Sequence, residues 1–374
     1  MGKQSPIAEY VQALKDAPRL KNQVVFSTVL PEKPADMAPR EPSFPGAMKK
    51  ILRSMGINRL YRHQAKALEK IRLGHDVAVA TATASGKILI YNLSVVERIL
   101  RNPDSRALYI YPLKALAQDQ LIAFRRFVTE LAPRSPKAEI YDGDTSAYKR
   151  RKIRDVPPHV IMTNPEMLHL SLLAFHAKWE TFWGSLETVV LDEAHTYRGI
   201  FGAHVAQIFR RLHRICDHYG SRPTYVFSSA TLANPAQLAH QLTGETPVAI
   251  DYNSAARGRR FVVLMDPMES PARAAILLLQ AALHRGLRTI IFTQSRKMTE
   301  LIALWAQQQV GPYADRIAAY RAGFLPEERR DIEARLAGGQ LLAVVSTSAL
   351  ELGIDIGDLD LCILVGYPGS IIST

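Results

Sequence analysis

Short runs of apolar residues alternate along the chain with longer segments in which apolar residues recur at helical spacing. The first runs read DVAVATAT, ALYIYPL, HVIMTN, TVVLDEA and TYVFSSA, and a second set reads RFVVLMD, RTIIFTQ, RIAAY, LLAVVST and LDLCILVGYP. Nearly continuous apolar strands separated by helices are typical of parallel sheets with helices on both faces. The pattern therefore predicts an α/β fold of two tandem doubly wound units.

The N-terminal segment has a different texture. Ile7, Tyr10, Val11 and Leu14 recur at helical spacing and predict one helix, and the prolines within residues 31–45 predict an extended arm. We expect four parts in chain order: a helix and proline-rich arm (1–45), the first α/β unit (46–250), a small basic linker (251–260) and the second unit (261–374).

Composition limits the class of protein. The chain is 47% apolar and 22% charged, which indicates an ordered globular protein, and its two cysteines, Cys216 and Cys362, exclude a disulfide scaffold. The longest apolar stretch, Ala274–Leu283, is too short to cross a membrane. We therefore expect a cytoplasmic protein without a membrane partner. The net charge of +12 favours nucleic acid as a partner.

A turn of small residues, Thr81–Lys87 (TATASGK), follows the first apolar run and opens a helical segment. The backbone N–H groups of such a turn bind phosphate oxygens, and Lys87 can reach the β and γ phosphates of a nucleotide. The leading glycine of the strict phosphate-loop pattern is absent. A tight strand-to-helix turn with a surface lysine therefore remains the alternative.

Two acids, Asp192 and Glu193, end the run TVVL. At this edge of a parallel sheet, Asp192 can hold Mg²⁺ through water, and Glu193 can orient or deprotonate an attacking water. An acidic pair at a strand end can also be a solvated turn, but the phosphate-loop candidate upstream favours a site. Ser229 and Thr231 follow the run TYVF and either cap the next helix or respond to the bound nucleotide.

The loop, the LDEAH and SAT motifs and the two α/β units resemble, in this order, a superfamily 2 helicase of the DEAD/DEAH-box type. LYRHQAKAL, TASGK, YDGDT, LDEAHTYRGIFGAHV, SSATLANP, ELGIDIG and VGYPGS are similar to the bacterial mitomycin-repair-type DNA helicases and their RecQ-four-like relatives. The resemblance implies two RecA-like P-loop NTPase domains, ATP and Mg²⁺ as cofactors, and single-stranded or tailed duplex DNA as partner. It also implies 3′-to-5′ movement in DNA repair, and we expect a monomer.

The resemblance assigns roles to the matching residues. ATP contacts are implied for Arg62, Gln64 (which reads adenine), Thr83, Ala84, Ser85, Gly86, Lys87, Ile88, Gly353 and Asp355. The implied catalytic set is Lys87, Asp192, Glu193 and His195, with Asp192 holding Mg²⁺ through water and His195 interpreted as a coupler rather than a base. Strand contacts are implied for Pro112, Lys114, Thr163, Asn164, Pro165, Thr293, Ser295, Arg296 and Thr347. Ser229 and Thr231 are the implied coupling residues.

Two departures from the family qualify this interpretation. Ile88 stands where the family has Thr or Ser, whose hydroxyl binds Mg²⁺, so we expect weakened metal binding and slower hydrolysis, unless Ile88 is simply the first core residue of its helix. The sequence also ends before the family's arginine motif and zinc region, so we expect a truncated second domain. Two alternatives stay open: a catalytically weak nucleic-acid-binding fragment and an RNA helicase.

Three basic clusters are candidates for nucleic-acid contact. Tyr148–Arg154 (YKRRKIR) is the densest, and its charges can neutralise several phosphates. The linker arginines Arg257, Arg259 and Arg260 are a second candidate. Arg210, Arg211 and Arg214 recur along one predicted helix, where a solvated face is the simpler interpretation.

Overall fold

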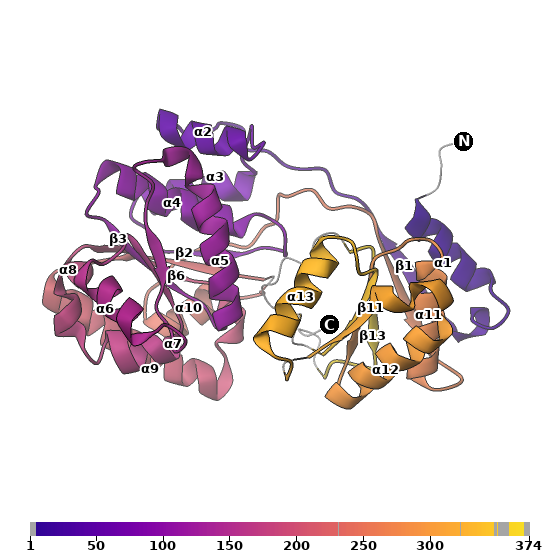
Figure 1. Ribbon diagram of the computed structural model, residues 1–374. Coiled ribbons are helices and arrows are strands. Elements are labelled where there is room, and N and C mark those ends of the chain that lie inside the picture. Colours follow the sequence, from indigo (N-terminus) through magenta and orange to yellow (C-terminus); the bar gives the residue numbers. More distant parts are fainter. Residues whose placement is uncertain (1–4, 231, 322, 348–349, 351–358, 370–374) are drawn as a thin grey trace. The chain divides into compact units, whose positions relative to one another are not determined.

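The computed structural model describes residues 5–230, 232–321, 323–347, 350 and 359–369. The chain forms two compact units: Lys33–Arg257, called the larger unit here, and Met1–Glu32 together with Gly258–Thr374, called the smaller unit. The chain thus passes between the units twice, after residue 32 and after residue 257. The colours of Figure 1 follow this path, with the indigo N-terminal segment and the orange C-terminal segment in one unit.

The larger unit is built on a seven-stranded sheet with the strand order β4-β5-β3-β6-β7-β2-β8. All of its strand pairs are parallel. In chain order the strands are β2 (Val77–Ala80), β3 (Arg106–Ile110), β4 (Ala138–Ile140), β5 (Val160–Thr163), β6 (Leu186–Leu191), β7 (Thr224–Ser229) and β8 (Val248–Ile250). The predicted parallel α/β architecture is therefore confirmed. The sequence analysis missed the short strands β4 and β8.

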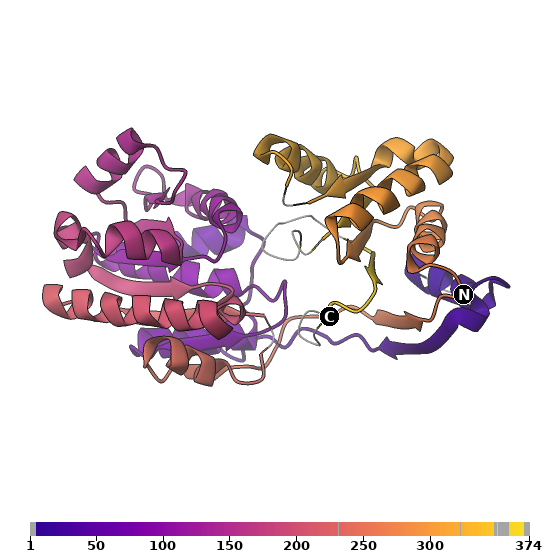
Figure 2. The same cartoon turned by 90° about the horizontal axis from the view of Figure 1, so that it is seen from below.

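Helices cover both faces of this sheet (Figures 1 and 2). They are α2 (Gly46–Ser54), α3 (Arg62–Arg72), α4 (Lys87–Arg101), α5 (Lys114–Phe127), α6 (Ala147–Asp155), α7 (Pro165–Met167), α8 (Glu180–Gly184), α9 (Gly199–Tyr219) and α10 (Pro235–Thr243). One buried apolar cluster joins the sheet to α2, α3, α4 and α5, and a second joins its other face to α8, α9 and α10. Because every strand is parallel, all carboxyl ends meet at one edge, where ligands bind in such sheets.

The smaller unit has a four-stranded parallel sheet with the order β11-β12-β10-β13. Its strands are β10 (Thr289–Thr293), β11 (Ile317–Tyr320), β12 (Ala343–Ser346) and β13 (Leu361–Val365). Helices α11 (Pro271–Leu283) and α12 (Arg296–Gln309) pack on one face, and α13 (Pro326–Ala337) contributes to the cluster on the other. The prediction of a second α/β unit is confirmed by these elements.

One predicted strand of the second set was placed in the wrong sheet. The run RFVVLMD forms β9 (Arg260–Met265), which pairs antiparallel with β1 (Val24–Leu30) in a separate two-stranded sheet. Burial alternates along β9, as in a strand with one exposed face, whereas a central parallel strand is buried on both. The sequence analysis did not predict β1, and this pairing groups the first 32 residues with the smaller unit.

The N-terminal helix α1 (Pro6–Asp16) belongs to the same cluster of side chains as β9 and α11. Tyr10 is buried there and donates a hydrogen bond from its hydroxyl to the carbonyl of Leu278, at 3.0 Å. The apolar stripe that predicts this helix is therefore the face that packs against α11.

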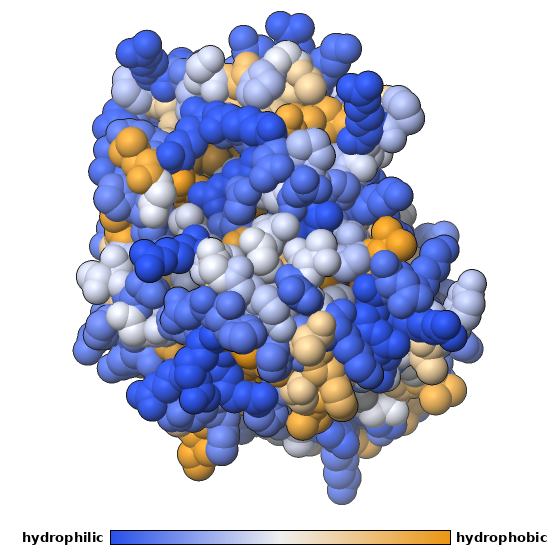
Figure 3. Space-filling view, turned by 90° about the vertical axis from the view of Figure 1, so that its left-hand side faces the viewer, coloured by the Kyte–Doolittle hydropathy of each residue, from blue (hydrophilic) through white to orange (hydrophobic). Residues whose placement is uncertain are grey.

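The surface on the side of α8 is mostly hydrophilic, with small separate apolar patches (Figure 3). Among the described residues, we find no helix with the length and apolar character required to span a membrane.

Candidate functional site

The turn after β2 has the shape expected of a phosphate-binding loop. Ala84 and Gly86 have positive φ angles of 61° and 78°, and Gly86 begins α4 as its N-cap. Inside the turn, the hydroxyls of Thr81 and Ser85 lie 2.6 Å apart and are buried. A Cβ atom added at Gly86 would lie 2.4 Å from the Gln64 amide nitrogen. Glycine at this position thus allows both the left-handed backbone and the close approach of Gln64.

Lys87 is the first residue of α4, and its ammonium group folds back over the turn. It donates hydrogen bonds to the carbonyls of Thr81 (2.9 Å) and Ala82 (3.1 Å). Burial lowers the pKa of Lys87, and the nearby carboxylates of Glu193 and Asp192 act in the opposite direction. A cation therefore lies beside the turn and close to both acids.

Asp192 and Glu193 follow β6 at the same edge of the sheet. Asp192 is only 4% exposed, and its carboxylate accepts hydrogen bonds from the hydroxyl of Tyr91 (3.2 Å) and from the Glu193 N–H (3.0 Å). Burial raises the pKa of Asp192. Burial and the neighbouring Asp192 raise the pKa of Glu193 to about 7. A carboxylate with a pKa close to neutral can exchange a proton with water at physiological pH.

Glu193 has a φ of 48°, which is rare for a residue with a side chain. This backbone turns the chain sharply from β6 into the short 3₁₀ helix Ala194–Thr196. His195 in that helix places Nδ1 3.3 Å from a carboxylate oxygen of Glu193. Strained backbone of this kind is concentrated at functional sites.

His195 also reaches the strand end of β7. Its Nδ1 lies 3.4 Å from the Ser229 hydroxyl and 3.4 Å from the Ala230 N–H, which donates to it. Burial lowers the pKa of His195, so the ring is neutral, with Nδ1 as an acceptor. The structure therefore brings the DEAH and SAT segments together through His195 and Ser229. Thr231, the second predicted coupling residue, lies outside the described residues.

Gln64 and Arg62 lie near the start of α3. The Gln64 amide accepts from the N–H of Tyr61 (3.0 Å) and donates to the carbonyl of Gly86 (3.1 Å), so it contacts the turn directly. The guanidinium of Arg62 pairs with Asp36 at 3.0 Å on the surface. Thr83 and Ala84 are exposed on the turn, and Gly353 and Asp355 lie outside the described residues.

Ile88 follows Lys87 and packs, partly buried, against the apolar cluster beneath α4. Both interpretations of Ile88 remain compatible with this position. The side chain contributes to the core, and it supplies no oxygen next to Lys87.

Three residues that the sequence analysis did not assign to the site contribute to it. Tyr91 hydrogen-bonds Asp192 from one turn further along α4, and the spacing of four residues from Lys87 was the available signal. His63 contacts the turn through the Ser85 carbonyl, and Ser254 contacts His63. His63 stands next to Gln64, but nothing in the sequence pairs it with Ser254.

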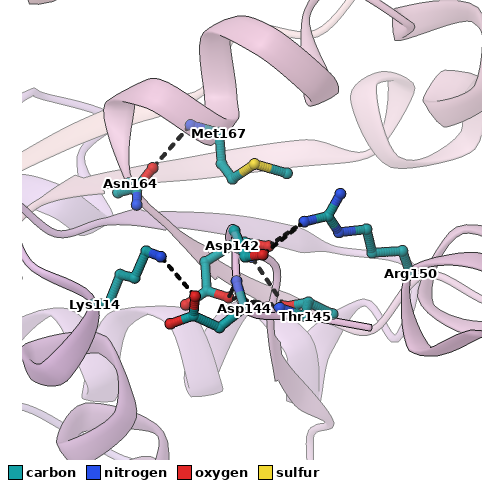
Figure 4. Close-up of polar contacts among 8 residues, drawn as sticks. Lys114, Asp142, Asp144, Thr145, Arg150, Asn164 and Met167 are labelled. Atoms are coloured by element: carbon teal, nitrogen blue, oxygen red, sulfur yellow. Dashed lines mark hydrogen bonds and ion pairs between the residues drawn. The ribbon is translucent and has the colours of Figure 1, made fainter. Parts of the chain in front are cut away.

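A second group of polar side chains lies where β3, β4 and β5 end (Figure 4). Lys114, the first residue of α5, forms a 2.7 Å ion pair with Asp144, and this hydrogen bond raises the pKa of Lys114. Asp142 is buried and accepts from the N–H groups of Asp144 and Thr145, each at 3.0 Å. Arg150 donates to the Asp142 carbonyl at 2.9 Å. The hydrogen bonds of the buried Asp142 therefore hold the turn that carries Asp144.

The other predicted strand contacts of the larger unit are less accessible. The Thr163 hydroxyl is buried and donates to the carbonyl of Tyr141, while Asn164 accepts from the Met167 N–H as the N-cap of α7. Pro165 is buried and Pro112 is partly buried. Of this predicted set, Lys114 is the residue with a charged side chain near solvent.

The smaller unit carries its predicted residues after β10 and β12. Ser295 and Arg296 are exposed at the start of α12, and Ser295 accepts from the Met298 N–H as its N-cap. Thr293 is buried, with its hydroxyl 2.7 Å from that of Thr299, and Thr347 is partly buried. The contacts recorded for Ser295 and Thr293 are local ones, to residues at the start of α12 and to each other.

The densest basic cluster is partly neutralised by neighbouring acids. The run Tyr148–Arg154 lies on α6, where Lys149 pairs with Glu139 (2.9 Å) and Arg151 approaches Asp155 (3.7 Å). Arg210, Arg211 and Arg214 line a surface hollow along α9.

The donor set suits Mg²⁺ only together with a nucleotide. In the part of the chain that the structure describes, no three His, Cys, Asp or Glu side chains group to hold a metal ion. Mg²⁺ in nucleotide enzymes commonly uses one or two carboxylates, phosphate oxygens and water. Asp192, which lies close to Lys87, is the carboxylate that the sequence analysis assigns to such a set, through water.

Comparison with known proteins agrees with these features. A family model described as DEAD/DEAH box helicase matches residues 61–238, and one described as helicase conserved C-terminal domain matches residues 269–374. The chain is 41% identical, over 99% of its length, to the uncharacterized ATP-dependent helicase YprA of Bacillus subtilis. It is 37% identical, over 85% of its length, to the ATP-dependent helicase hrq1 of Schizosaccharomyces pombe. The chain covers 50% of the first relative and 32% of the second.

Two solved structures are similar over almost the whole chain. The DUF1998 helicase MrfA bound to DNA superposes with a TM-score of 0.93 at 41% identity, covering 99% of this chain and 53% of that one. The same helicase bound to DNA and AMPPNP gives 0.92 at 40% identity, covering 98% of this chain and 52% of that one. The predicted resemblance to helicases of this branch is confirmed by these matches.

Proposed function

The chain belongs to the DEAD/DEAH-box helicases of superfamily 2, and on this premise we propose that it hydrolyses ATP to move along single-stranded DNA. The observation that carries the proposal is the convergence of Lys87, Asp192 and Glu193 at one sheet edge, next to a turn that opens a helix and has positive φ angles at Ala84 and Gly86. The DNA-bound and AMPPNP-bound states of the similar helicase support the choice of ligands. Movement in the 3′-to-5′ direction and a role in DNA repair are part of the proposal.

ATP would bind with its phosphates on the Thr81–Lys87 turn. Lys87 would exchange the carbonyls of Thr81 and Ala82 for β and γ phosphate oxygens, which are stronger acceptors for an ammonium group. The backbone N–H groups at the start of α4 would hold further oxygens. Gln64, already in contact with Gly86, would connect recognition of adenine with this turn.

Hydrolysis would depend on the two acids. Glu193 would orient the attacking water and accept its proton as the bond to the γ-phosphorus forms and the bond to the leaving ADP oxygen breaks. Asp192 would hold Mg²⁺ through water, and this ion neutralises charge on the phosphates when bound. His195 and Ser229 would transmit the change at the γ-phosphate toward the SAT segment.

The DNA strand would lie along the ends of β3 and β5, with Lys114 and Asn164 at the phosphates. The smaller unit would add Ser295, Arg296 and Thr347. Contacts of this type bind the backbone and carry little base specificity.

Two other functions are tested by the same experiment. Ile88 in place of a hydroxyl residue favours a weakly catalytic nucleic-acid-binding protein, and the fold also suits an RNA helicase. Steady-state ATPase is measured with and without oligo-dT and oligo-U, beside Lys87→Ala as the inactive control. DNA-stimulated turnover that Lys87→Ala abolishes supports the proposal. Binding of oligo-dT without turnover supports the first alternative, and stronger stimulation by oligo-U supports the second.

Direction is tested separately on duplexes with a single-stranded tail at either end. Unwinding of the 3′-tailed duplex alone is the expected result. Unwinding of the 5′-tailed duplex would contradict the proposed direction and leave the ATPase assignment intact.

A further inference from the structure

His63 is a fully buried histidine that uses both of its ring nitrogens. Its Nδ1 lies 2.6 Å from the Ser254 hydroxyl, and its Nε2 lies 3.1 Å from the carbonyl of Ser85 in the phosphate-binding turn. His63 is 0% exposed, and Ser254 and Ser85 are each 1% exposed. A buried polar group with defined partners on both sides fixes the segments that carry those partners.

The hydrogen-bond directions of this group follow from its donors. The Ser254 oxygen accepts from the backbone N–H of His63 at 2.9 Å, so its own proton is available for Nδ1. Nδ1 is then an acceptor and Nε2 carries the proton that is donated to the Ser85 carbonyl. Burial lowers the pKa of His63 to about 4, which keeps this neutral form at physiological pH.

Ser254 lies near the C-terminal end of the larger unit, in a segment that is hydrogen-bonded to the first residues of the same unit. Its carbonyl accepts from the Asp36 N–H at 2.8 Å, and Lys33 and Arg257 exchange two backbone hydrogen bonds of 2.8 Å. These residues come directly after and before the two points where the chain passes between the units. Both connecting segments are thus joined to each other within the larger unit, and Ser254 joins them to His63.

We propose that His63 and Ser254 form a clamp that positions the phosphate-binding turn and connects it to both segments through which the chain leaves the larger unit. The clamp acts through the Ser85 carbonyl, next to Gly86 and Lys87, and touches no reacting atom. His63 and Ser254 are therefore positioning residues. The inference rests on the proposed binding of ATP at this turn.

Two substitutions at His63 separate the hydrogen bond to Ser85 from the contacts with Ser254, whose backbone N–H also lies 3.4 Å from Nδ1. Glutamine places an amide N–H near the position of Nε2 and keeps the donor to Ser85, whereas the shorter asparagine reaches only toward Ser254. We expect His63→Asn to raise the Kd for a fluorescent ATP analogue, and the KM for ATP, about tenfold through loss of the bond that orients the turn. We expect His63→Gln to stay within about threefold of the parent chain. Equal affinities for the two variants would overturn the clamp.

Ser254→Ala tests whether the two residues act together. We expect it to raise the Kd about threefold in the parent chain and to add nothing in the His63→Asn background, because the path to Ser85 is already broken. Additive effects would contradict the proposal. Ser221→Ala is the matched control, since Ser221 is a buried serine at the end of α9 whose hydroxyl bonds the Cys216 carbonyl.

Thermal unfolding of every variant separates positioning from loss of fold. If His63→Asn does not fold, Ser254→Ala against Ser221→Ala decides, and equal Kd values for these two overturn the clamp. Failure of the clamp differs from failure of the proposed function. A parent chain that binds no ATP analogue rejects the ATP site, whereas a parent that binds it with all variants alike rejects the clamp alone.

Discussion

The carboxyl edges of the two parallel sheets differ in how firmly they hold their candidate residues. In the larger unit, Asp192 and Ser85 are 4% and 1% exposed and are hydrogen-bonded on several sides. In the smaller unit, Ser295 and Arg296 are exposed. The Ser295 hydroxyl accepts from the Met298 N–H, and its carbonyl accepts from the Thr293 hydroxyl at 3.2 Å. The larger unit thus holds Asp192 in buried hydrogen bonds, whereas Ser295 and Arg296 of the smaller unit lie at the surface.

Buried and exposed groups suit different functions, namely catalysis and binding of a nucleic-acid backbone. Buried, preorganised groups stabilise developing charge strongly because no water or side chain must reorganise during the reaction. Exposed groups that meet a strand backbone contribute small, salt-screened contacts. We therefore expect substitutions at Lys87, Asp192 and Glu193 to change turnover by orders of magnitude, and those at the proposed strand-contact residues of either unit to change affinity by small factors.

The largest effect is expected for Glu193→Gln. Removal of the base should reduce ATP turnover by about 10²–10⁴-fold while ATP binding persists, because the substitution keeps the size of the side chain. Steady-state ATPase and equilibrium binding of an ATP analogue measure the two quantities. The control is Glu187→Gln at the start of the same strand, where no change in turnover is expected. Normal turnover in Glu193→Gln would contradict the role of Glu193 as the base and the expected difference between the two sheet edges.

Ile88→Thr is expected to have the next largest effect, in the opposite direction. A hydroxyl next to Lys87 would supply the missing oxygen for Mg²⁺ and raise turnover by about 10–100-fold. The same substitution should lower the thermal stability slightly, because Ile88 packs against the core. ATPase titrated with Mg²⁺ measures the change. Unchanged turnover, with a loss of stability, would instead establish Ile88 as a core residue only.

The free energy of unfolding should depend on pH because the pKa of Glu193 is higher in the folded state than in the unfolded state. The unfolded carboxyl releases its proton near pH 4.5 and the folded one near pH 7, so the folded state binds more protons between these values and loses stability as the pH rises. Glu193→Gln removes this loss. We expect the variant to match the parent at about pH 4–5 and to exceed it by on the order of 2 kcal/mol at about pH 8.

Chemical unfolding of the parent and of Glu193→Gln at the two pH values measures this difference. Glu187→Gln should follow the parent at both. A constant difference between Glu193→Gln and the parent across the range would contradict the raised pKa.

The smallest effects are expected at the strand contacts. Lys114→Ala should weaken oligo-dT binding a few-fold and reduce the slope of log K against log salt by about 0.7, as expected for one lost phosphate contact. Arg296→Ala should cost less still, and Lys137→Ala, which removes an exposed lysine at the opposite end of β4, should cost nothing. Fluorescence anisotropy at several salt concentrations tests all three. A larger loss from Arg296→Ala than from Lys114→Ala would reverse the comparison.

Burial also explains which strands could be predicted from the sequence. Strands buried on both faces leave nearly continuous apolar runs, so β2, β3, β5, β6 and β7 were recognisable. The three-residue strand β4 includes Glu139, and β8 is equally short, so neither produces such a run. Strand β9 does produce one. Its partner, β1, lies so far away along the chain that no local pattern indicates the pairing.

Among the candidate site residues, too, those in local motifs could be predicted and those brought together by long-range packing could not. Lys87, Asp192 and Glu193 stand at strand ends in short motifs, and the sequence analysis predicts them from these motifs taken together and from the resemblance to helicases. The side chains that support them come from separate segments: Tyr91 from within α4, and His63 and Ser254 from positions 191 residues apart. Tertiary packing brings these side chains together, and a single sequence contains no pattern that indicates such contacts.

The pairing of β1 with β9 also sets an order of events during synthesis. Val24 emerges from the ribosome long before its partner Met265, and at about 5–20 residues per second the delay is roughly 10–50 s. The whole of the larger unit is made within that interval and can fold first. Until β9 is made, the backbone N–H and C=O groups of β1 lack the partners that β9 provides. In a newly made chain, the β1–β9 pair therefore forms after the larger unit has been synthesised.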